Sequence, residues 1–271
     1  MFESIKDRRS EGATTLRKTQ LVELYLLQIF DEICKKHGLR YFLVGGTLIG
    51  AMRHNGFIPW DDDIDVGMLK PDFEKFLSIA AKLLPDGVEL QRPKDAFSAV
   101  TFAKLRDKKS FFGEPNTMVG APHGIFVDVF PYEKMPNLPY KFVYRLVRWR
   151  AGAFRRWRFA LLEQRRSVIA KLADCVKAVF WKFGHFAVCA LWRGLCIIFS
   201  GRGWHMAPEQ EYPNRATEDQ LFPTREHEFE GLQFPIPNDW EWVLKTEYSN
   251  WRELSPESDR FCHTKLVIPD M

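Results

Sequence analysis

The sequence lacks most features of secreted, repetitive or disulfide-stabilised proteins. Its five cysteines are an odd number, and none is spaced as Cys-x-x-Cys. This spacing argues against a disulfide framework and gives no zinc-binding signature. The N-terminal segment, Met1 to Gln20, is polar and charged without an apolar core, so we expect no signal peptide. The sequence also has no internal repeat and no low-complexity linker. Because we expect neither a disulfide framework nor a signal peptide, the protein is predicted to be cytoplasmic and peripheral, on the cytosolic face of a membrane.

The composition is that of a globular protein. The 271 residues are 46% hydrophobic and 27% charged, enough for one larger domain or for one domain with an insertion. The net charge of +4 hides an asymmetry. Acidic residues gather at 61–65 and in the C-terminal third, whereas Lys and Arg gather at 141–202. The two kinds of charge are therefore segregated along the chain.

The stretch at 43–68 carries the densest chemistry, and it reads LVGGTLIGAMRHNGFIPWDDDIDVGM. Period-2 alternation predicts a strand in which Asp63 and Asp65 share one face while Ile64 and Val66 face the core. Two carboxylates this close repel each other unless a cation lies between them, and Mg²⁺ takes one or two carboxylates together with substrate phosphates. The alternative is a solvated acidic turn, which the apolar residues within the run disfavour. The stretch therefore indicates phosphate chemistry.

A glycine pair precedes the aspartates. Tyr41–Val44 is a short apolar strand that runs into Gly45, Gly46 and Thr47. Two glycines let backbone N–H groups approach an anion closely, and a helix over Leu48–Met52 would present its N-terminus to phosphate. A strand, a glycine turn, a helix and an Asp-x-Asp strand in this order are far more specific than a glycine pair alone.

This order resembles the nucleotidyltransferase fold of the DNA polymerase β type. More closely, the string GGTLIGAMRHNGFIPWDDDIDVGM is similar to the signature of the LicD family, whose members move phosphocholine or a related phosphodiester group from a nucleotide-activated donor to a cell-surface glycan. A second family-like segment, HGIFVDVFP, occupies 123–131. The resemblance implies an α+β fold, in which a mixed sheet with flanking helices carries an inserted basic and aromatic helical segment.

The resemblance also implies roles for individual residues. Asp63, Asp65 and, on a neighbouring strand, Asp128 would be catalytic and would hold one or two Mg²⁺ ions, or Mn²⁺ in their place. Asp128 lies among apolar neighbours, and a carboxylate in such a position is costly to bury without a cation or a basic partner. The donor phosphates would be bound by Gly45, Gly46, Thr47, Arg53, Trp60, Asp61 and Lys104. Two alternatives stay open: Arg53 can pair with Asp61 instead, and Trp60 can form a structural corner.

A predicted strand over 100–106 places Lys104 and Arg106 on one face, where two cations can meet a bound phosphate. The alternative is that both are surface residues of an edge strand. The family resemblance favours the phosphate role for Lys104.

From residue 139 the composition changes. Arginines interleave with aromatic residues, and Val176–Ser200 is apolar but interrupted by basic residues. A spanning helix needs about 20 predominantly apolar residues with few or no charges, so we expect helices that lie at the interface of an anionic membrane. A plain helical hairpin with solvated arginines is the main alternative, and nucleic-acid binding is disfavoured.

Other elements follow from local signals. We expect helices over 16–36, stopped by Gly38, over 70–84, and over 240–248 after Asp239, with a hairpin turn at Glu230-Gly231. The predicted organisation is a catalytic core at 1–138, a helical insertion at 139–205, and a C-terminal part at 206–271 that completes the core.

Together these signals predict a metal-dependent transferase that moves phosphocholine from CDP-choline, or a similar activated donor, to a sugar hydroxyl. The acceptor would be a lipopolysaccharide, teichoic acid or capsule precursor, in a lipid-linked form. One alternative on the same fold is a nucleotidyltransferase or a phosphopolyol or phosphosugar transferase. Another is a non-catalytic membrane-associated protein that binds glycan or lipid. The oligomeric state is not predicted.

Overall fold

The computed structural model describes residues 2–93, 101–114, 121–162, 167–199, 203–205, 216–248, 250–260, 262 and 266–271. The chain forms two compact units. Unit 1 comprises Met1–Arg92, Phe102–Pro131 and Asp219–Met271, and unit 2 comprises Pro93–Thr101 and Tyr132–Glu218. The domain boundaries proposed from the sequence remain a prediction, and Val100 of the predicted strand lies outside the described residues.

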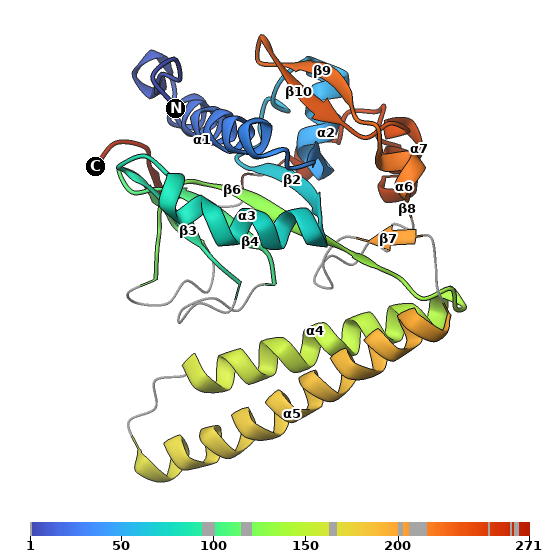
Figure 1. Cartoon of the computed structure of the whole chain (residues 1–271). Helices are drawn as coiled ribbons and strands as arrows, with labels where there is room; N and C mark the ends of the chain where they lie inside the picture. Colours follow the sequence, from blue (N-terminus) through green and yellow to red (C-terminus); the bar gives the residue numbers. More distant parts are fainter. Residues whose placement is uncertain are drawn as a thin grey trace. The chain divides into compact units, whose positions relative to one another are not determined.

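Unit 1 is built on a sheet whose strands lie in the order β1, β2, β6, β4, β3 (Figure 1). Their bounds are β1 Phe42–Leu43, β2 Ile64–Leu69, β6 Phe126–Lys134, β4 Ala103–Asp107 and β3 Val88–Gln91. The neighbouring pairs β1–β2, β6–β4 and β4–β3 are antiparallel. Sheet and helices together agree with the predicted α+β class. Because β4 lies between β6 and β3, the edge-strand interpretation of Lys104 and Arg106 is wrong.

Two long helices of unit 1 pack on this sheet, α1 (Thr15–His37) and α3 (Lys70–Leu83). Each begins and ends where its local signals predict. Thr14 caps α1 by accepting a hydrogen bond from the Arg17 N–H, and Gly38 ends it with a left-handed backbone at φ +61°. The two helices contact each other through Phe30 and Phe76, whose ring centroids are 5.0 Å apart.

A third group of elements in unit 1 surrounds the short helix α2 (Gly45–His54). It consists of the hairpin β9 (Arg225–Phe229) and β10 (Leu232–Ile236), and of α7 (Trp240–Glu247), and both β9 and α7 contact α2. The hairpin turns at Glu230-Gly231, where both residues have positive φ, as predicted. The remaining short elements of this unit are η1 (Arg9–Glu11), β5 (Phe111–Phe112), which pairs with β11 (Val267–Ile268), and η2 (Glu257–Asp259). The helix α6 (Glu218–Leu221) crosses the boundary between the units.

Unit 2 is a helical hairpin of α4 (Tyr140–Leu162) and α5 (Val168–Ile198), whose described parts lie side by side (Figure 1). Its core contains Met135, Val143, Val147 and Trp192. Two short strands, β7 (Gly203–His205) and β8 (Ala216–Thr217), pair with each other, and β7 pairs with the end of β6. All five cysteines of the chain are free.

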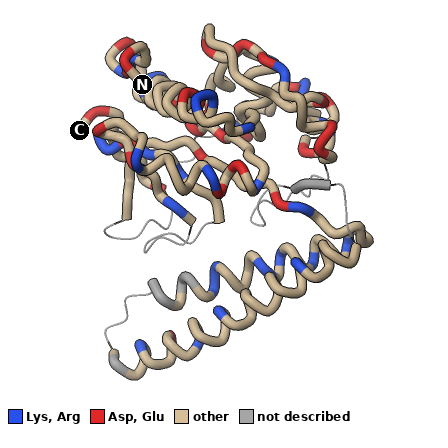
Figure 2. Tube along the Cα trace, viewed as in Figure 1, with Lys and Arg blue, Asp and Glu red and all other residues tan. Residues whose placement is uncertain are grey.

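The helix α5 leaves a wide apolar stripe exposed. Residues spaced three and four apart on one side of it, Leu172, Val176, Val179, Phe180 and Phe183, are each more than half exposed. Lysines and arginines recur along both helices (Figure 2). Among the described residues, one helix, Ile169–Ile198, is long and apolar enough to cross a membrane by length and composition alone. From the sequence we expect no such run, because basic residues interrupt the apolar segment Val176–Ser200; the length and composition of the helix differ from this expectation.

Candidate active site

The Asp-x-Asp pair lies at the start of β2, which is placed between β1 and β6 in the sheet of unit 1. Ile64 and Val66 are fully buried, whereas Asp63 and Asp65 keep part of their surface exposed. This alternation is the one predicted for a strand with its carboxylates on one face. The backbone of Asp65 is fixed on both sides, because its N–H donates to the Thr47 hydroxyl at 2.8 Å and its carbonyl accepts from the Val44 N–H at 3.2 Å.

The glycine pair does not form a turn ahead of the helix, since α2 begins at Gly45 itself. Gly45 has φ +58°, and a Cβ atom there would lie 2.9 Å from Asp65 Oδ2. A Cβ atom on Gly46 would lie 2.8 Å from Asp61 Oδ2. The glycines therefore let two carboxylates approach the first turn of α2, where free N–H groups and the helix dipole stabilise negative charge.

Asp128 has the basic partner that its burial requires. It lies opposite Lys104 in the register of β6 and β4. Lys104 Nζ is 2.9 Å from Asp128 Oδ1 and 2.9 Å from Glu114 Oε1. All three belong to unit 1, and Lys104 is only 5% exposed. Lys104 therefore neutralises protein carboxylates in this structure, and its predicted role toward donor phosphate stays a prediction.

Arg106 has a similar position one strand pleat away. It donates to Gln91 Oε1 and to the Gly124 carbonyl, each at 2.7 Å, and forms an ion pair with Glu114. Burial disfavours the charge on Glu114, but Lys104 and Arg106 outweigh it and hold the pKa of Glu114 below its ordinary 4.5. Glu114, which the sequence analysis did not single out, therefore links the two basic residues of β4.

The acidic groups of the site act strongly on one another. Burial, followed by the charge of Asp63 and then that of Asp128, raises the pKa of Asp65 well above its usual 3.8. Burial raises the pKa of Asp128 to about 6, although Lys104 opposes this shift. Carboxylates that raise each other's pKa in this way form a centre that favours a proton or a cation.

The other predicted donor-binding residues contact the C-terminal segment of unit 1. Arg53 Nη1 donates to the carbonyls of Trp251 and Glu253 at 3.1 and 2.7 Å, so these bonds connect it to the backbone rather than to Asp61. The Arg260 guanidinium lies 4.3 Å from the ring centroid of Trp60. The hydroxyl of Tyr248 would lie 3.7 Å from a Cβ atom on Gly45. The C-terminal segment therefore borders the site.

Besides Glu114, sequence reasoning missed Glu23 on α1. Its side chain is fully buried, and among the described residues neither of its carboxylate oxygens has a hydrogen-bond partner. A signal was available, because Glu23 lies four residues before Leu27 and seven before Phe30, within the apolar stripe of the helix. An acidic residue in such a stripe indicates either a buried hydrogen-bond or charge partner or a functional site.

The fit of this site to a divalent cation depends on its donor set. Among the residues described, no three His, Cys, Asp or Glu side chains are grouped closely enough to hold a metal ion by themselves. Mg²⁺ does not need such a cage, because it is usually bound by one or two carboxylates together with water and substrate phosphates. Asp63 and Asp65 provide that pair, and the neighbouring acids raise the electrostatic benefit of a cation. The donor set therefore fits Mg²⁺.

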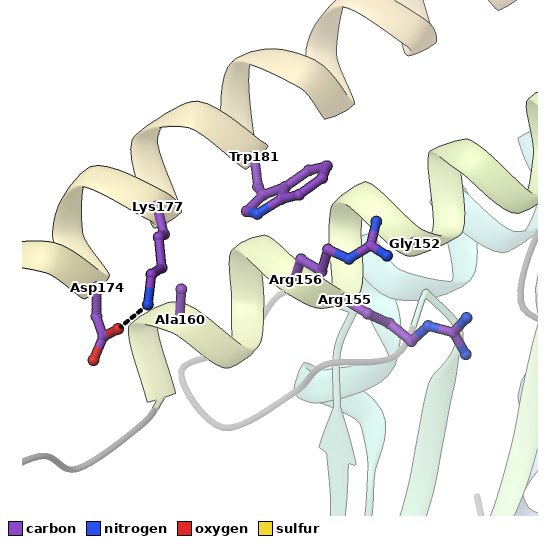
Figure 3. Close-up of a pocket in the computed structure, with 7 residues that line it drawn as sticks. All are labelled: Gly152, Arg155, Arg156, Ala160, Asp174, Lys177 and Trp181. Atoms are coloured by element: carbon purple, nitrogen blue, oxygen red, sulfur yellow. Dashed lines mark hydrogen bonds and ion pairs between the residues drawn. The ribbon is translucent and has the colours of Figure 1, made fainter.

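Unit 2 has a cavity of its own, of about 550 Å³, between α4 and α5 (Figure 3). Arg155 and Arg156 border it from α4, and Asp174, Lys177 and Trp181 border it from α5. Lys177 pairs with Asp174 at 3.3 Å, and the Arg156 guanidinium lies 4.6 Å from the Trp181 ring centroid. Three cations against one acid make this cavity suitable for an anion.

The fold and the site define an α+β protein with an acidic centre beside the start of a helix. Comparison with known proteins identifies the family to which a protein of this class belongs. Residues 38–154 match the family model described as LicD/FKTN/FKRP, nucleotidyltransferase domain. The chain is 30% identical to the lipopolysaccharide cholinephosphotransferase LicD of Haemophilus influenzae over 268 residues, covering 92% of this chain and 96% of that protein. The chain belongs to the LicD family.

Shorter similarities point to other members. Over 35 residues, 13% of this chain and 7% of the relative, it is 54% identical to the ribitol 5-phosphate transferase FKRP of Homo sapiens. It is also 28% identical, over 143 residues, to an uncharacterized protein of Rickettsia typhi. The family resemblance read from the GGT and DDDID motifs is thereby confirmed.

Proposed function

We propose that this protein transfers phosphocholine from CDP-choline to a sugar hydroxyl of lipopolysaccharide or a related cell-surface glycan. The observation that carries the proposal is the similarity to a lipopolysaccharide cholinephosphotransferase over 96% of that protein. The acidic centre of unit 1, which we assign to a nucleotidyltransferase-like fold, supports it because the reaction takes place at a diphosphate.

In the proposed reaction the sugar hydroxyl oxygen attacks the phosphorus that bears choline. The bond from this phosphorus to the bridging oxygen of the diphosphate breaks, and CMP leaves with that oxygen. The hydroxyl proton passes to one of the site carboxylates, whose raised pKa makes it a better proton acceptor at neutral pH. Asp63 and Asp65, with Asp128 as the predicted third acid, would hold Mg²⁺, which offsets negative charge on the diphosphate.

The chain's own residues prepare the site for this chemistry. Thr47 and Val44 fix the backbone of Asp65, and Lys104 keeps Asp128 in place. Rigid placement of reacting and charge-bearing groups is a large part of catalysis in phosphoryl transfer. Asp61 and Asp65 lie close to the first turn of α2. We therefore propose that this turn stabilises the negative charge of these carboxylates as well as that of the donor phosphate.

A second candidate is transfer of a phosphopolyol on the same fold. The segment that is 54% identical to a ribitol 5-phosphate transferase favours it. The two reactions share the leaving nucleotide and differ in the mass added to the acceptor. A nucleotidyltransferase, in contrast, would leave the nucleotide on the acceptor.

Mass spectrometry of a reaction with the purified protein, Mg²⁺, CDP-choline and lipopolysaccharide tests the proposal. We expect release of CMP and a phosphocholine mass on the glycan, both lost in the Asp63→Asn/Asp65→Asn double variant. Circular dichroism shows whether that variant is folded. A polyol phosphate added from CDP-ribitol alone would support the second candidate. A nucleotide on the acceptor, or turnover equal in the double variant, would refute phosphocholine transfer by these acids.

We further propose that unit 2 contacts the cytosolic surface of an anionic membrane, where a lipid-linked acceptor would be met. The exposed stripe of α5 would enter the apolar boundary of the lipid headgroups. The basic cavity bordered by Arg155, Arg156 and Lys177 suits the phosphate of a lipid headgroup.

A further inference from the structure

The corner at Phe57–Asp61 brings the chain from α2 to the acidic segment. Within it the Asp61 N–H donates to the Ile58 carbonyl at 2.9 Å, which closes a turn. The remaining aspartates of the DDDID motif follow directly, and β2 begins among them. The position of this corner therefore determines where the acidic segment starts.

Two hydrogen bonds from distant parts of the sequence hold the corner, one at each end. At its start, the Phe57 N–H donates to Glu230 Oε1 at 3.3 Å. At its end, the Asp61 carbonyl accepts from Gln20 Nε2 at 3.0 Å. Glu230 belongs to the turn between β9 and β10, whereas Gln20 belongs to α1, so two separate elements of unit 1 meet the corner.

Arg17 connects these two side chains. Its Nη2 is 2.6 Å from Glu230 Oε2, and its Nη1 donates to Gln20 Oε1 at 3.2 Å. Because a guanidinium holds its donors in a rigid planar fork, one arginine can fix two partners at once. Arg17, Gln20 and Glu230, which we call the corner clamp, thus form a continuous hydrogen-bonded chain between the two ends of the corner.

The surroundings of the corner clamp fix its geometry. Gln20 is only 5% exposed, and both the oxygen and the nitrogen of its amide have partners. On the other side, a Cβ atom on Gly56 would lie 2.5 Å from Glu230 Oε1, so a glycine there lets the carboxylate approach the backbone. A satisfied network of buried polar groups rigidifies the structure around it. The corner clamp is therefore suited to holding a segment in one position.

The segment that the corner clamp holds is the one that carries the acidic centre. Gln20 fixes the Asp61 carbonyl, and the Thr47 hydroxyl fixes the Asp65 N–H at 2.8 Å. The acidic segment is thus bound by a side chain at each of its ends. Because the rate of a reaction between positioned groups falls steeply when they are displaced, both attachments bear on the chemistry.

We propose that Arg17, Gln20 and Glu230 are positioning residues for the transfer reaction, which hold the start of the acidic segment as Thr47 holds its end. The inference rests on the proposed function. It adds three residues outside the GGT and DDDID motifs, and they act through the backbone of Phe57 and Asp61 without touching the substrate.

Gln20→Leu tests the corner clamp where it meets the acidic segment, because leucine has a similar size and forms no hydrogen bonds. We expect kcat for transfer from CDP-choline, measured per folded molecule, to fall about tenfold. The double variant Arg17→Met/Gln20→Leu should lose little more than Gln20→Leu alone, because residues that act as one unit are not additive. A role in stability alone would lower the folded fraction and leave kcat per folded molecule unchanged, which would overturn the inference.

Hydrogen exchange followed by mass spectrometry tests the corner clamp without the reaction. In Arg17→Met and Gln20→Leu, peptides covering residues 56–62 should exchange about three- to tenfold faster than in the wild type, as expected when a hydrogen bond is lost. Peptides covering β4 should exchange as in the wild type. Unchanged exchange at the corner in both variants, with wild-type transfer, would overturn this inference and leave the proposed function intact.

Lys18→Met is the matched control for Arg17→Met. Lys18 is the next residue of α1, its side chain is 36% exposed against 39% for Arg17, and it pairs with Asp270 instead of Glu230. It should keep wild-type exchange at the corner and wild-type kcat. Equal losses in Lys18→Met and Arg17→Met would overturn the inference, because the charge of α1 and not the corner clamp would be responsible. Absence of transfer by the wild type would overturn the proposed function and the role of the corner clamp in it.

Discussion

Lys104 and Asp128 face each other across two central strands of unit 1, with Lys104 Nζ 2.9 Å from Asp128 Oδ1. Both side chains are at least nine-tenths buried. A buried ion pair is a weak source of stability as a whole, but removing one partner leaves the other charge buried and unpaired.

Lys104→Met should therefore destabilise the protein by about 3–5 kcal/mol, as measured by urea unfolding. Asp128→Asn should cost less than Lys104→Met, because Lys104 keeps its second charge partner, Glu114. The double variant Lys104→Met/Asp128→Leu should cost less than the sum of the single changes, because it leaves neither of the two charges unpaired. Strict additivity of the two single changes would show that the pair is not coupled.

Gly45 offers a test of the close approach between α2 and Asp65. The backbone of Gly45 has φ +58°, and a Cβ atom there would lie 2.9 Å from Asp65 Oδ2. Gly45→Ala should cost about 1–2 kcal/mol in backbone strain, and it should also reduce transfer activity strongly, because Asp65 must move.

Gly38→Ala is the matched control for this variant. Gly38 has nearly the same φ, +61°, but a Cβ atom there has nothing within 4 Å. It should show the same loss of unfolding free energy with activity close to that of the wild type. Equal activity loss in both variants would mean that strain alone, and not the displaced carboxylate, is responsible.

The sequence predicted those parts of the fold whose causes are local. Gly38 ends α1, and the Glu230-Gly231 turn fixes its hairpin, because caps and turns depend on a few adjacent residues. The alternation that separates Asp63 and Asp65 from the core is equally local.

The partners of the charged groups could not be predicted in the same way. The pairing of Lys104 with Asp128 depends on the register of two strands that are 24 residues apart at this point. The pairing of Arg17 with Glu230 depends on how α1 packs against the β9–β10 hairpin. Both are tertiary facts, so a pattern of residue types in one sequence indicates that a buried charge needs a partner without identifying it.

The pH dependence of stability should reveal Glu23 in metal-free protein. Burial and the neighbouring aspartates raise the pKa of its carboxyl well above 4.5, so the folded state binds the proton more tightly than the unfolded state. The Glu23 contribution to stability is then complete below the unfolded pKa and is lost as the pH rises toward the folded pKa.

We therefore expect Glu23→Gln to gain stability over the wild type as the pH is raised from about 5 to about 8 in EDTA, because glutamine does not titrate. Urea unfolding at each pH measures the difference. A difference that is constant over this range would mean that Glu23 titrates alike in the folded and unfolded states.

The apolar stripe of α5 should decide how unit 2 meets a membrane. Phe180 and Phe183 are 66% and 71% exposed. Burying one such side chain in an apolar phase contributes about 1.5–3 kcal/mol. Phe180→Gln/Phe183→Gln should therefore weaken binding to vesicles of phosphatidylglycerol and phosphatidylcholine at least tenfold in a flotation assay. Leu254→Gln, which changes a 55% exposed residue of unit 1, is the control and should bind like the wild type.

The basic cavity should make the membrane binding of unit 2 depend on lipid charge. Arg155→Gln/Arg156→Gln should lose about 1 kcal/mol per arginine on anionic vesicles and little on neutral ones, and added salt should reduce the difference. An interfacial helix is released by carbonate at high pH, whereas a spanning helix stays with the membrane, so extraction separates these two arrangements for α5. If vesicle binding changed neither with the phenylalanine substitutions nor with the lipid charge, the exposed stripe would have to pack against another protein instead of a membrane.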